Sequence, residues 1–256
     1  MRLIAFMILI CLYSHTVVGA EEAISQRILP PQQVKVSAPN NFELNAHFFQ
    51  AEKSIGGVLI FHDCNDTLNP YLALAESFQL ARIDALVLNM RGFGGSISEL
   101  YSHEAIKRKS KDIISYQQNA ALLYAFWGDD GVLAFNYLRN KIGRKKPISI
   151  VSSGCSAHTA VQVAEKVHVS ASVFIEPVMD YMAKEQYKNL IDMPNYFIGS
   201  VHQTESFQTA KEMFNWNGDS GSKIQMFKGS IYRTNSKDRS SSLYIDIAKW
   251  VAFHSR

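Results

Sequence analysis

Residues 85–96 read Ala-Leu-Val-Leu-Asn-Met-Arg-Gly-Phe-Gly-Gly-Ser. Four consecutive apolar residues at 85–88 are typical of a short strand that is buried on both faces of a sheet. The part from Asn89 to Ser96 is rich in glycine, which permits sharp turns of the backbone. The stretch therefore predicts a buried strand that ends in a loop, at the sheet edge where ligands of parallel sheets bind.

The same alternation of strand and helix continues on both sides of this stretch. It predicts an α/β fold with a mostly parallel twisted sheet and helices on both faces. Residues 33–39 and 41–50 alternate apolar and polar side chains around Asn40-Asn41, which predicts an antiparallel hairpin at a sheet edge. The other expected strands are 58–61, 148–151, 171–175, 196–198 and 224–227, and the expected helices are 71–81, 131–138, 157–167, 206–214 and 243–253.

The first twenty residues have the pattern of a secretory signal. Arg2 is followed by an apolar stretch at 3–13 and by small residues up to Ala20, so we expect cleavage after Ala20 and export to the periplasm or the extracellular space. The remaining residues, 21–256, are expected to form a single domain, since 47% of the 256 residues are hydrophobic. No stable membrane span is expected after cleavage.

Charge and motifs exclude several classes of ligand. The formal net charge is +3, which is too small to predict nucleic-acid binding. The sequence has no zinc-binding pattern and no phosphate-binding glycine loop after a strand, so neither a metal nor a cofactor is predicted. The basic and apolar segment 97–126 is the hardest to interpret. A helix is suggested around 120–123, and the segment is a candidate for docking a protein or a membrane surface.

The order of four segments resembles the α/β-hydrolase fold family, over nearly the whole mature chain. Residues 57–64 (Gly-Val-Leu-Ile-Phe-His-Asp-Cys) are similar to its strand and oxyanion-hole turn, and residues 89–96 to its Arg-Gly-x-Gly-x-Ser loop. Residues 127–138 and 148–164 are similar to the helix, strand and elbow around the nucleophile. The region 177–194 has room for one short helix, so the resemblance is to small members without a large lid, such as dienelactone hydrolases.

The resemblance implies a Ser-His-Asp triad, but the matching positions hold other residues. The family's elbow is G-x-S-x-G, and the alignment that matches the helix alanines puts Gly154 at the nucleophile position. The acid position falls near His202 and the base position near Tyr232. We therefore expect that the chain has lost triad catalysis and binds a small molecule or a protein partner, whose identity the sequence does not give.

A shift of the elbow by one residue gives an alternative. The pattern Ser153-Gly-Cys-Ser-Ala157 is similar to the cysteine elbow of dienelactone hydrolases. Cys155 would then be the nucleophile, with His158, Glu176 or His202 as its partners. In this interpretation the chain is an unconventional hydrolase of esters, thioesters or lactones.

The resemblance also places Cys64 and Cys155 together. Both correspond to residues whose backbone N–H groups form the family's oxyanion hole, so in an oxidising compartment they are candidates for a disulfide. The alternative is that both are buried small residues.

Four further residues have expected structural roles. His62 is predicted to hydrogen-bond its own loop. Arg91 is predicted to bind neighbouring backbone carbonyls, with an anion in the pocket as the alternative. Asp129 and Asp130 are predicted to stabilise a helix start.

Overall fold

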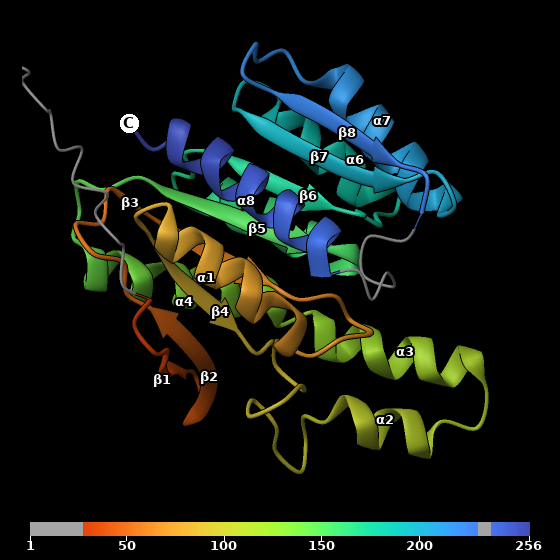
Figure 1. Cartoon of the computed structure of the whole chain (residues 1–256). Coiled ribbons are helices and arrows are strands. Elements are labelled where there is room, and N and C mark those ends of the chain that lie inside the picture. Colours follow the sequence, from red (N-terminus) through yellow and green to blue (C-terminus); the bar gives the residue numbers. More distant parts are fainter. Residues whose placement is uncertain (1–27, 230–236) are drawn as a thin grey trace, which may run out of the picture.

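The computed structural model describes residues 28–229 and 237–256, and its centre is an eight-stranded sheet (Figure 1). The strands are β1 (Gln32–Ala38), β2 (Phe42–Phe49), β3 (Gly56–Phe61), β4 (Ile83–Leu88), β5 (Ile148–Ser153), β6 (Ser172–Ile175), β7 (Asn195–Ser200) and β8 (Lys223–Phe227). Their order across the sheet is β1-β2-β4-β3-β5-β6-β7-β8. The pairs β1–β2 and β2–β4 are antiparallel and all other pairs are parallel. The predicted sheet and N-terminal hairpin are confirmed.

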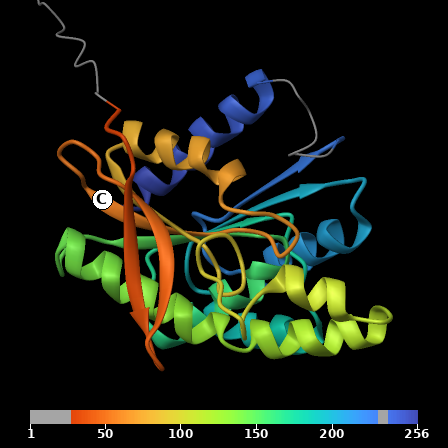
Figure 2. The same ribbon diagram turned by 90° about the horizontal axis from the view of Figure 1, so that it is seen from below.

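Helices cover both faces of the sheet (Figure 2). They are α1 (Leu72–Leu80), α2 (His103–Lys109), α3 (Ile113–Tyr124), α4 (Trp127–Ile142), α5 (Ala157–Lys166), α6 (Tyr181–Tyr187), α7 (Thr204–Trp216) and α8 (Lys237–Phe253), with short 3₁₀ turns η1 (Asn69–Tyr71), η2 (Gly154–Ser156) and η3 (Lys188–Leu190). α1 and α8 pack together on one face, and α4 and α5 pack together on the other. Within the described ranges, no helix is both long and apolar enough to cross a membrane.

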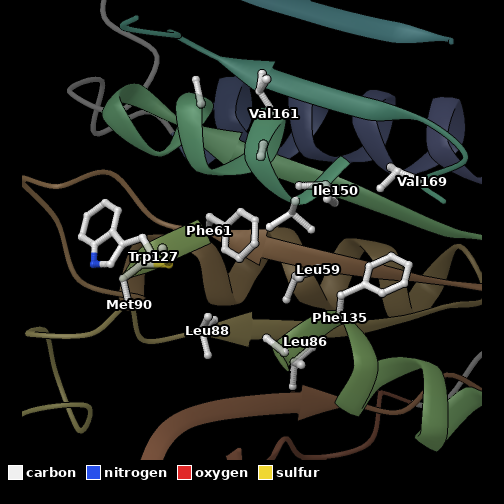
Figure 3. Packing of buried hydrophobic residues seen from close by; sticks show 14 of the residues in the cluster. Leu59, Phe61, Leu86, Leu88, Met90, Trp127, Phe135, Ile150, Val161 and Val169 are labelled. Atoms are coloured by element: carbon white, nitrogen blue, oxygen red, sulfur yellow. The ribbon is translucent and has the colours of Figure 1, made fainter. Parts of the chain in front are cut away.

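Two buried apolar clusters lie on opposite faces of the sheet. The strand residues alternate between them, so that Leu59 and Phe61 belong to one cluster and Val58 and Ile60 to the other. Figure 3 shows side chains of the first cluster, which joins β3, β4 and β5 to α4 and α5. Each fully buried side chain of this size contributes about 1.5 to 3 kcal/mol, so this packing fixes where the strands end.

The turn between β1 and β2 follows from its residues. Asn40 and Asn41 have φ angles of 61° and 57°, in the left-handed region that asparagine tolerates better than most residues. The turn sets the register in which Ala38 faces Phe42.

Residues 97–126 contain two helices, where the sequence suggested only one around 120–123. The starts of both helices are capped, because Ser102 Oγ accepts the Ala105 N–H at 3.2 Å and Asp112 Oδ1 accepts the Ser115 N–H at 2.7 Å. α2 and α3 extend side by side beyond the sheet (Figure 1). The region 177–194 holds the short α6 and η3, and no large lid lies among the residues that the structure describes.

Candidate functional site

The candidate site lies where two neighbouring parallel strands end. β3 and β5 pair side by side, with Phe61 opposite Ser152. The residues that follow them, His62 to Cys64 and Gly154 to Ser156, therefore meet at the carboxyl edge of the sheet. This is the edge of the sheet at which the resemblance places an elbow and an oxyanion hole.

Gly154 has the backbone of a sharp turn and no room for a side chain. Its φ angle is +55°, in the left-handed region that favours glycine. A Cβ atom on Gly154 would overlap the Oδ2 atom of Asp63. The Asp63 carboxylate, which comes from the neighbouring strand end, thus occupies the space that a side chain at Gly154 would take.

Hydrogen bonds fix the position of Asp63. Its Oδ1 accepts the backbone N–H of Asn65 at 2.7 Å and the Asn65 side-chain amide at 3.1 Å. Its own backbone N–H donates to the hydroxyl of the buried Tyr71 at 3.0 Å. Burial raises the pKa of the Asp63 carboxyl, and the hydrogen bonds from Asn65 lower it. This role of Asp63 was not predicted, because nothing in the order of the residues shows where its side chain points.

Cys64 and Cys155 form a disulfide, with Cα atoms 5.9 Å apart. The Cys64 N–H donates to the Cys155 sulfur at 2.9 Å. An oxyanion hole would need this N–H, but here it is directed at sulfur. The bonded sulfur of Cys155 also has no thiolate, so the interpretation of Cys155 as a nucleophile does not hold for the oxidised protein.

Two of the other four residues proposed for catalysis have hydrogen-bond partners of their own. The His158 ring shares a 2.8 Å hydrogen bond with the Gln186 amide oxygen. Glu176 is only 6% exposed, and its Oε2 accepts the Gln203 amide at 3.2 Å. His202 is exposed on the loop after β7. Tyr232 lies outside the described residues.

His62 is buried and doubly hydrogen-bonded. Its Nδ1 donates to the Asp63 carbonyl at 2.7 Å, and its Nε2 accepts the Met90 N–H at 3.0 Å. This arrangement requires a neutral ring, and burial lowers the pKa of His62 to about 4. The ring therefore ties the end of β3 to the loop after β4.

Arg91 binds a carboxylate, and the prediction that it binds backbone carbonyls was wrong. Its Nε and Nη2 donate to the two oxygens of Asp130 at 2.8 and 2.7 Å, with both residues buried. The guanidinium also lies 4.2 to 4.8 Å from three ring centres, those of Phe42, Tyr101 and Phe126. An anion in the pocket therefore cannot reach the Arg91 guanidinium. Asp130 lies in the first turn of α4, but its carboxylate pairs with Arg91.

A cavity of about 810 Å³ opens beside the disulfide. The loop after β4, the helices α2 and α3, and residues 64–67 after β3 line it. Inside it the His103 ring stacks on Phe93 with ring centres 4.5 Å apart, and its Nε2 shares a 2.8 Å hydrogen bond with the Tyr116 hydroxyl. Burial lowers the pKa of His103. This wall of the cavity was not predicted from the sequence, because α2 was not predicted.

No protein-family model matches the chain, and no curated protein matches its sequence. Solved structures do match. A dienelactone hydrolase from Anabaena variabilis has 14% identity and a TM-score of 0.67, over 89% of this chain and 100% of that one. A variant of monoglyceride lipase from Saccharomyces cerevisiae has 9% identity and a TM-score of 0.67, over 90% and 97%. The esterase Pf2001 from Pyrococcus furiosus has 12% identity and a TM-score of 0.63, over 88% and 93%.

These structures establish the class to which the chain belongs by its architecture, the α/β-hydrolase fold. Within that fold, this protein has a glycine at the elbow, a carboxylate above it and a disulfide across the neighbouring strand ends.

Proposed function

We propose that this chain is an exported ligand-binding protein of the α/β-hydrolase fold that has lost hydrolysis by a Ser-His-Asp triad. The observation that carries the proposal is the Asp63 carboxylate in the space of an elbow side chain at Gly154. Loss of the nucleophile alone costs a hydrolase roughly a millionfold in rate. The disulfide adds to the loss because it directs the Cys64 N–H away from any substrate oxyanion.

The cavity beside Cys64 supports binding of a small organic molecule. Its volume of about 810 Å³ falls in the range of about 300 to 1,000 Å³ that is common for ligand pockets. Phe93, His103 and Tyr116 give it flat apolar surfaces and a few polar atoms. These flat rings can stack against a ligand that contains a double bond or a ring.

Thermal unfolding with a panel of esters, lactones and carboxylic acids tests binding. A ligand is expected to raise the melting temperature of the wild-type protein, since it binds only the folded state. His103→Ala should abolish this shift, whereas His202→Ala, at an exposed site outside the cavity, should keep it. A shift that survives His103→Ala would place the ligand elsewhere and contradict the assignment of the cavity.

Hydrolysis of p-nitrophenyl acetate at high protein concentration tests the loss of catalysis. We expect no turnover above buffer, from either the wild type or Gly154→Ser, because Asp63 fills the space that the new hydroxyl needs. Turnover in the wild type that appears on reduction and disappears in Cys155→Ala would favour the cysteine hydrolase instead.

Export rests on residues 1–20, which lie outside the described residues, and the disulfide is consistent with it. The protein secreted by its native host should begin at Glu21 when its N-terminus is sequenced. A chain that keeps Met1 and stays in the cytoplasm would contradict export.

A further inference from the structure

Three metal-binding side chains lie together at the ends of β3 and β5. One ligand atom each from Asp63, Cys64 and Cys155 lies within 4.8 Å of the others. All three residues are partly exposed, so that solutes can reach them. We propose that reduction of the disulfide creates a binding site for a thiophilic divalent cation, Zn²⁺, with these three side chains as its ligands. The proposal does not rest on the ligand-binding function proposed for the cavity.

The donor set fits the coordination of zinc. Zinc binds cysteine sulfur at about 2.3 Å and carboxylate oxygen at about 2.0 to 2.2 Å, in tetrahedral geometry. Around one such ion the two sulfurs would lie about 3.8 Å apart, a spacing that follows from those bond lengths. The Cα atoms of Cys64 and Cys155 are 5.9 Å apart. Rotation of the two side chains can therefore separate the sulfurs while the strands stay in place.

The orientation of the Asp63 carboxylate suits a metal ligand. The two hydrogen bonds from Asn65 go to Oδ1, and Oδ2 is the atom that lies over Gly154. Because Gly154 has no side chain, Oδ2 can approach the end of β5. The absence of a side chain at Gly154 thus leaves room for the Asp63 carboxylate to coordinate a metal ion.

Reduction changes the charge of the cluster. A dithiol gives two electrons and two protons to the disulfide, becomes a disulfide itself and leaves two thiols on the protein. Zinc binds the thiolates, so the two protons are released when the ion binds. The Cys64 N–H points at the Cys155 sulfur, and Cys155 lies in the turn that leads into α5, so both features favour a thiolate there. Two thiolates beside a carboxylate repel one another, and a divalent cation offsets that repulsion.

The three side chains fill three of the four coordination positions of a tetrahedral zinc ion. Cys64 lines the cavity of about 810 Å³, so a water molecule from the cavity can complete a tetrahedron. Zinc sites with three protein ligands commonly keep such an open position.

Titration with Co²⁺, a spectroscopic substitute for Zn²⁺, tests the site. The full chain is reduced with a phosphine under argon, desalted and titrated. We expect one Co²⁺ per chain, a thiolate-to-cobalt charge-transfer band, intense tetrahedral d–d bands, and displacement of Co²⁺ by Zn²⁺. The oxidised protein should show none of these. Zn²⁺ should raise the melting temperature of the reduced protein only, and should restore the native near-ultraviolet circular dichroism if reduction unfolds the chain.

Matched variants identify the ligands. Cys64→Ser and Cys155→Ser should each weaken binding by about 100-fold or more, the upper end of the loss seen when even outer partners of a metal site are removed. Asp63→Asn should weaken binding while it keeps the charge-transfer band, because both thiolates are still present. Asp66→Asn, a nearby carboxylate outside the cluster, should bind like the wild type. Absence of the band in reduced wild type, or equal affinity in Asp63→Asn, would overturn the proposed site.

Discussion

Replacement of both Cys64 and Cys155 by alanine is expected to lower the free energy of unfolding by about 4 to 5 kcal/mol. The two residues are 91 positions apart, so their bond closes a long loop and removes much of the entropy of the unfolded chain. A typical domain is stable by only about 5 to 15 kcal/mol. Urea denaturation, followed by circular dichroism, measures the loss.

The reduced wild type is the matched control for this pair of substitutions. A phosphine reductant should shift the wild-type denaturation curve toward that of the double variant, and it should leave the curve of the double variant unchanged. Mass spectrometry of non-reduced peptides reports the bond directly. Two free thiols in the purified oxidised protein would show that the bond does not form.

Gly154→Ala is expected to lower the free energy of unfolding by about 3 kcal/mol, from two separate causes. A residue with a Cβ is strained by about 1 to 2 kcal/mol in the left-handed region, where Gly154 lies with a φ of +55°. The added methyl group also overlaps the Asp63 carboxylate, and such overpacking costs about 1 to 3 kcal/mol. The same denaturation experiment measures the sum.

Two further variants help to separate the two causes. Gly143 has a φ of +93° and a ψ of 157°, a different region that is also essentially restricted to glycine. A Cβ there meets nothing within 4 Å, so Gly143→Ala should show a backbone cost of about 1 to 3 kcal/mol and no overlap. In the double variant Asp63→Gly/Gly154→Ala the overlap is absent, and the two substitutions should couple by about 1 kcal/mol or more in the favourable direction. Additive effects would mean that the carboxylate does not occupy the elbow space.

The sequence predicted those parts of the fold that depend on local pattern. The continuous apolar run of β3 and the asparagine turn before β2 are signals of this kind, and both elements formed where expected. The two caps at Ser102 and Asp112 are also local signals, and a search for helix starts in 97–126 could have found α2 and α3.

The contacts that could not be predicted from the sequence are those between residues far apart in the chain. Arg91 and Asp130 are 39 positions apart, and no local pattern shows that the arginine is paired with this carboxylate. Asp63 stands in the turn after β3, and no role was predicted for its side chain. Its position over Gly154 depends on how β3 and β5 align. The glycine in the turn after β5 could be read from the sequence, but the carboxylate that fills the space beside it could not.

The cross-link between the ends of β3 and β5 has a consequence for how the chain responds to proteases. The two cysteines are 91 positions apart, and the segment between them includes β4, α2, α3 and α4. The exposed turn around Lys111 joins α2 to α3. A cut in that turn leaves two fragments that are still covalently joined through sulfur. The nicked protein therefore stays one covalent molecule until a reducing agent separates the two fragments.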